Sequence, residues 1–170
     1  MLIFFTLSLK LDGIVEEVIV EIDSFSQLKE AMKGKVFHVT SMESLLEIKK
    51  SGCFLNNLSE NRSSWFGNTN GYFRNKGCIS FFDYRKIDDC PEWLPGRCNP
   101  LDILRHDSMA LLVIKPEAYL KLVVPGRRET SKERKMNLVP MIEVGIKSSL
   151  SLKLIECAYL VYKKSPATIK

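Results

Sequence analysis

The segment 37–41 places a histidine and a threonine where a ligand could be held. His38 ends an apolar run, and Thr40 stands two residues later at the start of a helical pattern. At such a strand-to-helix junction, side chains and helix backbone amides can converge on one ligand. Taken alone, the pattern equally fits a histidine that is hydrogen-bonded within its own loop.

A second segment, 77–85, joins an aromatic strand pattern to an arginine. Phe81, Phe82 and Tyr84 alternate imperfectly, so at least one ring should face away from the core. Arg85 follows them, and its planar guanidinium group can bind a phosphate or a carboxylate. The alternative is an arginine at an edge strand with its side chain in solvent.

A third segment, 139–146, holds one carboxylate in an otherwise apolar strand pattern. Burial of Glu143 without a partner would be costly, so this residue should have a partner or a function. Side chains alternate along a strand, so Glu143 shares a face with Met141 and Gly145. The alternative is that this face belongs to an edge strand and is open to solvent.

These three segments need a scaffold, which the hydrophobic pattern predicts as short strands with few helices. The first two strands are separated by Asp12-Gly13, a hairpin signal. The strands are expected at 4–11, 14–22, 35–39, 78–82, 109–114, 119–124, 139–146 and 158–162.

Helices are expected mainly in the N-terminal half of the chain. Capping boxes formed by Ser24 with Gln27 and by Thr40 with Glu43 open two of them. Glycines at 34 and 52 end these helices, and a further short helix is expected at 101–106. The fold class is therefore α+β.

Two segments lack a regular pattern. The polar segment 55–77 carries aromatic side chains that should pack or bind something, among them Trp65, Phe66, Tyr72 and Phe73. The segment 126–137 is predicted to be a solvated, mobile loop. Its charged residues are Arg127, Arg128, Lys132, Arg134 and Lys135, against Glu129 and Glu133.

Composition restricts the class of protein. A chain of 170 residues with net charge +5 and 45% hydrophobic residues is predicted to be one ordinary globular domain. No apolar run reaches the roughly 20 residues that span a bilayer, so no membrane partner is expected. The apolar start at 1–9 has no preceding basic residues, which argues against a signal peptide and for a cytoplasmic location.

The five cysteines are predicted to be free thiols. Cys90, Cys98 and His106 fall in one irregular region, but their spacing matches no zinc module. We therefore expect no metal site.

Taken in order, the three segments resemble the motifs of the ADP-ribosyltransferase fold. The His-x-Thr strand before a helix resembles the first motif, Ser-Phe-Phe-x-Tyr-Arg the second, and the Ile-Glu-Val strand the third. The arrangement is most similar to DNA-targeting ADP-ribosyltransferase toxins of bacterial toxin–antitoxin pairs. The resemblance covers roughly residues 36–162 and implies a compact domain at 35–170 with a split, antiparallel-rich β core. Residues 1–34 would then be a hairpin-and-helix extension packed on that domain.

The resemblance implies NAD as substrate and gives each motif residue a role. Glu143 would stabilise the positive charge that develops on the ribose. His38 and Thr40 would hold the dinucleotide, Phe82 or Tyr84 would stack on the nicotinamide, and Arg85 would pair with a phosphate or position the acceptor. Tyr72 is a further candidate for stacking. We expect Glu143 and His38 to lie on opposite walls of one cleft.

The acceptor is less defined by the motifs. Arginine-modifying members of the family carry Glu or Gln two residues before the catalytic glutamate, and Met141 stands there in this chain, which argues against that activity. The basic residues Arg127, Arg128, Arg134 and Lys135 could bind a DNA or RNA acceptor. A toxin or phage-defence role, with an antitoxin or immunity protein as partner, would agree with the resemblance.

Two other functions agree with the same residues. The chain could be a non-catalytic α+β module that contacts nucleic acid or a protein through its basic loop. It could also resemble RNA 2′-phosphotransferases, which share the fold but use basic residues where this chain has Glu143.

Overall fold

The computed structural model describes residues 8–9, 15–22, 24–56, 70–91, 94, 107–127 and 130–164, and each statement below refers to these residues. The expected helix at 101–106 lies outside them, as do Trp65, Phe66, Cys98 and His106.

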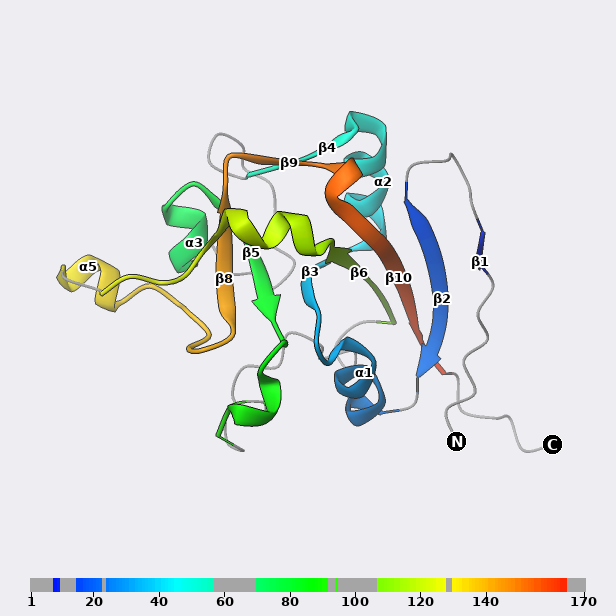
Figure 1. The fold of residues 1–170 in the computed structure, drawn as a ribbon, viewed down its shortest axis with the longest axis horizontal. Helices are drawn as coiled ribbons and strands as arrows, with labels where there is room; N and C mark the ends of the chain where they lie inside the picture. Colours follow the sequence, from blue (N-terminus) through cyan, green and yellow to red (C-terminus); the bar gives the residue numbers. More distant parts are fainter. Residues whose placement is uncertain are drawn as a thin grey trace.

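One large mixed sheet forms the centre of the molecule (Figure 1). Its eight strands lie in the order β1-β2-β10-β6-β3-β5-β8-β7. Neighbouring strands are antiparallel except for β2 and β10, which are parallel. The strands are β1 Ser8–Leu9, β2 Glu16–Ile22, β3 Val36–Thr40, β5 Cys78–Asp83, β6 Ser108–Ile114, β7 Leu122–Val123, β8 Glu143–Lys147 and β10 Ile155–Lys163.

Short helices and a second, small sheet complete the fold, so the α+β prediction is confirmed. The small sheet consists of β4 Cys53–Leu55 and β9 Ser149–Ser151. The α-helices are α1 Phe25–Met32, α2 Met42–Ser51, α3 Tyr72–Asn75 and α5 Ser131–Arg134. The 3-10 helices are η1 Ile87–Asp89, η3 Pro116–Lys121 and η4 Leu152–Leu154.

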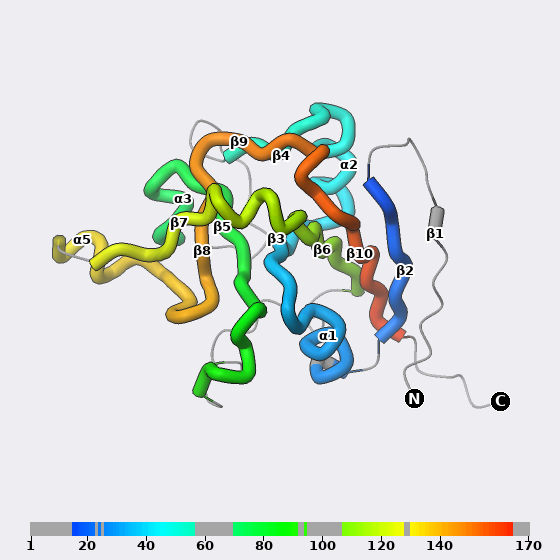
Figure 2. The backbone as a smooth tube through the Cα atoms, viewed as in Figure 1, coloured from blue at the N-terminus to red at the C-terminus, as the bar shows by residue number. Residues whose placement is uncertain are grey.

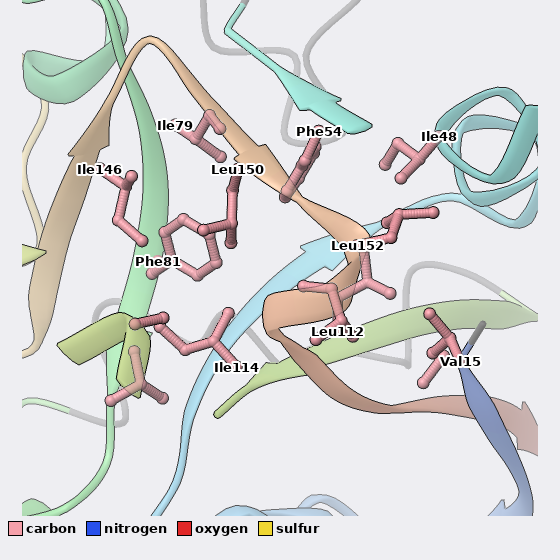
Figure 3. Close-up of a cluster of buried hydrophobic side chains, with 14 of the residues drawn as sticks. Val15, Ile48, Phe54, Ile79, Phe81, Leu112, Ile114, Ile146, Leu150 and Leu152 are labelled. Carbon is pink, nitrogen blue, oxygen red and sulfur yellow. The ribbon is translucent and has the colours of Figure 1, made fainter. Parts of the chain in front are cut away.

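The sheet buries a hydrophobic cluster on each face. On one face, Leu28 and Met32 of α1 pack against Phe37 of β3 and Leu111 of β6. On the other face, α2 and the small sheet cover a second cluster that includes Phe54, Phe81 and Leu112 (Figure 3). We call these the α1 face and the α2 face.

The first two helices begin differently from the prediction. Ser24 precedes α1, but its side chain makes no capping hydrogen bond. Thr40 ends β3, and Ser41 caps α2 by accepting a hydrogen bond from the Ser44 N–H at 3.0 Å. Gly52 ends α2 in the left-handed conformation, as expected, with φ 68°. Ser24 is therefore the N-cap residue of α1, as predicted, but without the capping box. The capping box at Thr40 is wrong because β3 continues one residue farther than its pattern indicates.

Three strand predictions also needed correction. The expected strand at 119–124 is mostly η3, because Pro116 opens a 3-10 helix and only Leu122–Val123 pairs with β8. The strand at 139–146 begins at Glu143, after a tight turn. The last strand is longer than 158–162 because β10 pairs along both β2 and β6.

β2 belongs to the expected N-terminal extension at residues 1–34, and it pairs with β10 of the main sheet (Figure 2). The division of the chain into an extension and a domain at residue 34 remains a prediction.

β3 and β5 are neighbours over a short length only. Their ladder has two pairs, Val36↔Asp83 and Phe37↔Phe82. Beyond these pairs, β3 continues along β6 to Thr40, while β5 continues along β8 to Cys78. The sheet therefore loses its regular pairing between β3 and β5 at the position of His38 and Ser80.

Candidate functional site

Glu143 is the first residue of β8, and its carboxylate is buried and fully partnered. Glu143 is only 8% exposed. Oε1 accepts a hydrogen bond from Ser80 Oγ at 2.6 Å, and Oε2 accepts one from the Val139 N–H at 2.7 Å. Burial raises the pKa of Glu143, while the bonds from Ser80 and Val139 oppose that rise. The solvent-exposed alternative for Glu143 is thereby excluded.

The same carboxylate closes a strained turn. The Ile142 N–H donates to the Pro140 carbonyl at 2.8 Å, and Met141 between them has φ 68°, a rare conformation for a non-glycine residue. The Glu143 N–H also donates to the Val139 carbonyl at 3.1 Å. Glu143 therefore holds this turn through both its backbone and its side chain, and Met141 is exposed at the tip.

His38 lies where β3 and β5 lose their ladder. Its Nδ1 is 2.7 Å from the carbonyl oxygen of Ser80, and a carbonyl only accepts, so Nδ1 carries the proton. The ring lies edge-on to Phe54 at 4.5 Å and to Phe81 at 5.8 Å, measured between centroids. Burial lowers the pKa of His38 to about 4, so the imidazole is neutral at pH 7.

Ser80 connects the two predicted residues, and the sequence reasoning missed it. Its carbonyl accepts from His38, and its hydroxyl donates to Glu143. Three adjacent strands, β3, β5 and β8, are thus linked by two consecutive side-chain hydrogen bonds (Figure 1). A signal was available, because Ser80 is a polar residue within an apolar strand pattern.

The expectation that Glu143 and His38 form opposite walls of one cleft is wrong. The pairs Phe37↔Phe82 and Phe82↔Glu143 place these three side chains on one side, the α1 face. Because side chains alternate, His38 points to the α2 face, where it meets Phe54 and Phe81. Thr40 shares the face of His38 and is buried.

The rings proposed for nicotinamide stacking belong to the core. Phe82 and Tyr84 are both buried in the cluster of the α1 face. Tyr84 packs edge-on against Phe37 at 4.9 Å between centroids, and burial raises the pKa of its hydroxyl. As packed, neither ring is available to stack on a ligand.

Arg85 is already paired with a carboxylate of the chain itself, so the alternative of an arginine with its side chain free in solvent is wrong. Its Nε and one terminal nitrogen donate to the two oxygens of Asp83 at 2.9 and 2.6 Å. Its guanidinium also stacks on the Tyr119 ring at 4.5 Å. The hydrogen bonds that Arg85 donates to the Asp83 carboxylate are the main cause of a raised pKa for Arg85. A phosphate at this site would have to compete with Asp83.

The basic segment is more ordered than a solvated loop. Residues 131–134 form α5, whose capping box joins Thr130 and Glu133. Glu133 also pairs with Lys76 beside α3. The Tyr72 N–H donates to the Asn137 carbonyl at 2.8 Å. Residues 130–137 are therefore not wholly irregular, because α5 forms within them and residues 70–76 contact them; most of their side chains are exposed, as expected.

Arg127, Arg134 and Lys135 belong to this basic segment, whose helix α5 lies at one side of the molecule (Figure 2). Arg127, Arg134 and Lys135 are exposed, and Arg128 lies outside the described residues. The Glu133 carboxylate pairs with Lys76.

Removal of the ion pair between Lys76 and Glu133 should speed local opening of residues 131–137, with only a small effect on the stability of the whole protein. We expect Lys76→Met to change the free energy of unfolding by about 1 kcal/mol or less, because the pair is partly exposed. Amide hydrogen exchange at residues 131–137 should become faster. Lys50→Met, which removes the local pair with Glu47, serves as the control and should leave that exchange unchanged.

Stability should fall in acid through His38. The unfolded imidazole titrates near 6.5 and the folded one near 4, so its stabilising effect is complete above pH 6.5 and is lost as the pH falls toward 4. Chemical denaturation across this interval should show a loss of up to about 1.4 kcal/mol per pH unit from this group. The difference between wild type and His38→Gln isolates the effect; equal pH profiles would contradict it.

Comparison with protein-family models, curated proteins and solved structures finds no match for the chain. None of the described helices has the length and apolar character needed to cross a membrane. Within the described ranges, no cluster of His, Cys, Asp or Glu residues could hold a metal ion.

Proposed function

We propose that this chain is an NAD-dependent ADP-ribosyltransferase that modifies nucleic acid. The observation that carries the proposal is the linkage of His38, Ser80 and Glu143 across β3, β5 and β8, where β3 and β5 lose their ladder. The three segments that resemble the family motifs are thus adjacent in space, although they are far apart in the sequence.

Transfer of ADP-ribose breaks the bond between nicotinamide and ribose, and positive charge develops on the sugar. The Glu143 carboxylate would stabilise this charge electrostatically, and Ser80 would orient it. His38 has its proton on Nδ1, so its Nε2 would accept a hydrogen bond from a ribose hydroxyl.

The opposite faces of the two side chains limit the binding mode. A ligand that meets both His38 and Glu143 must lie between β3 and β5. Because Glu143 is buried, the turn at 139–142 would have to move when NAD binds. Because Phe82 and Tyr84 are buried in the core, neither is proposed to stack on the nicotinamide.

Nucleic acid is the acceptor that the charge pattern favours. Arg127, Arg134 and Lys135 are exposed on the segment that precedes β8. Contacts from these side chains to phosphates would make binding of the acceptor fall steeply with salt. A role in a toxin or phage-defence system, with a protein that neutralises the activity, would follow from such a modification.

The test is an assay of NAD turnover. The pure protein is incubated with NAD that is labelled in the adenylate portion, alone and with DNA, RNA or cell lysate. We expect release of free nicotinamide and transfer of label to DNA or RNA. No nicotinamide release and no labelling under any of these conditions would overturn the proposal. An arm with 2′-phosphorylated RNA detects the related phosphotransferase activity.

A non-catalytic binding module is the second candidate. The hydrogen bond from the Val139 N–H to the Glu143 carboxylate favours this candidate. Because that bond closes the turn at 139–142, it explains the burial of Glu143 without a catalytic role. In that case NAD would cause no thermal shift. Binding to nucleic acid or protein would depend on Arg127, Arg134 and Lys135, and it would be insensitive to His38→Gln.

A further inference from the structure

The sheet edge at β7 is open and bears apolar side chains. β7 is the last strand in the sheet order, and no other strand of the described chain pairs with its outer side. Leu120 is 95% exposed and Val124 is 70% exposed. The Leu122 N–H already donates to the Tyr119 carbonyl, so a further strand would pair through the other backbone groups on the outer side of β7. Exposed apolar side chains beside an edge strand are typical of a docking surface. We call residues 120–124 with Arg127 the β7 edge.

The β7 edge is positively charged. It includes Lys121 and Arg127, and Lys147 ends the neighbouring strand β8; all three side chains are exposed. The pair Leu122↔Ile146 brings Lys121 and Lys147 to the same end of the strand pair. A partner at this edge should therefore be acidic, and a second copy of the chain would meet like charges.

We propose that the β7 edge binds an extended, acidic segment of a partner protein, which joins the sheet as a further strand. Backbone hydrogen bonds to β7 would hold the segment, and its alternate apolar side chains would cover Leu120 and Val124. Its carboxylates would pair with Lys121 and Arg127. The apolar side chains favour a protein over nucleic acid, whose binding rests mainly on phosphate contacts.

The test uses a fluorescent peptide of alternating valine and glutamate, roughly eight residues long. Fluorescence anisotropy should show saturable binding to the full-length protein. Val124→Glu and Leu120→Glu should each weaken binding at least about tenfold. Leu46→Glu is the matched control, because Leu46 is an exposed leucine on α2, and it should leave binding unchanged. Thermal melts confirm that the variants fold.

Two further measurements separate strand addition from simple charge attraction. N-methylation of alternate peptide amides should abolish binding, and the bound peptide should slow amide exchange at residues 122–124. No saturable binding, or equal binding of the methylated peptide, would overturn the proposal. A thymidine oligonucleotide serves as the competitor. If it displaces the peptide, and if its own binding is lost in Leu120→Glu and Val124→Glu, the β7 edge binds nucleic acid instead. None of these measurements uses NAD, so their failure is distinct from failure of the transferase activity.

Discussion

Glu143→Gln should lower nicotinamide release by roughly a hundredfold or more, if the proposed transferase activity is present. Glutamine has the same shape but no negative charge to stabilise the positive charge on the ribose. Its amide oxygen can accept from the Val139 N–H, and its NH₂ can donate to the Ser80 hydroxyl, so both contacts can be kept while the charge is lost. The measurement is the initial rate of nicotinamide release below the melting temperature of the variant.

The control for this change is a second buried carboxylate. Glu17 is also buried, and it pairs with Lys49 of α2 at 2.9 Å, away from Ser80. Glu17→Gln should therefore keep the wild-type rate although it loses a comparable buried charge. A folded Glu143→Gln variant with the wild-type rate would show that the carboxylate is not catalytic.

Ser80→Ala tests whether the hydrogen bond from Ser80 to Glu143 contributes to activity apart from the charge of Glu143. The variant keeps the carboxylate but removes a hydrogen bond that lowers the pKa of Glu143, so this pKa should rise further. The activity should then fall mainly on the acid side, where more of the carboxylate is protonated, and it should recover at higher pH. Loss of activity that is equal at every pH would contradict this role of Ser80.

Gly145→Ala should destabilise the protein by about 3 kcal/mol, the upper part of the range for overpacking. A Cβ at Gly145 would lie 2.3 Å from Cδ1 of Phe73, 2.7 Å from its Cε1 and 3.0 Å from Cβ of Cys78. Phe73 is a buried ring of α3, and Cys78 lies on the neighbouring strand, so neither can move freely. For a domain of this size the melting temperature should fall by roughly 10 °C.

Gly126→Ala is the matched control, because the nearest atom to a Cβ there is the Tyr72 hydroxyl at 3.9 Å. Its free energy of unfolding should change by about 0.5 kcal/mol or less. Phe73→Leu should restore part of the stability lost in Gly145→Ala, which a double-mutant cycle measures as a coupling energy. Additive effects would show that the ring of Phe73 does not cause the clash.

The elements that could be predicted are those whose signals lie within a few residues. The helix that ends at Gly52 is recognisable because its apolar periodicity and its terminal glycine are local features. The turn before Glu143 was not predicted, because its strain at Met141 is supported by a side chain that binds back to Val139. The start of α2 was also missed, as shown by the cap at Ser41 in place of Thr40.

By itself the sequence determined the α+β class, and it indicated that Glu143 would need a partner if it were buried. The first follows from local periodicity, and the second from the free energy of burying a charge. Only the tertiary structure decided which residues form hydrogen bonds or ion pairs with one another. His38 meets Ser80 at a separation of 42 residues, Ser80 meets Glu143 at 63, and Lys76 meets Glu133 at 57. Strand order and register set the first two contacts, and they also place His38 and Glu143 on opposite faces of the sheet.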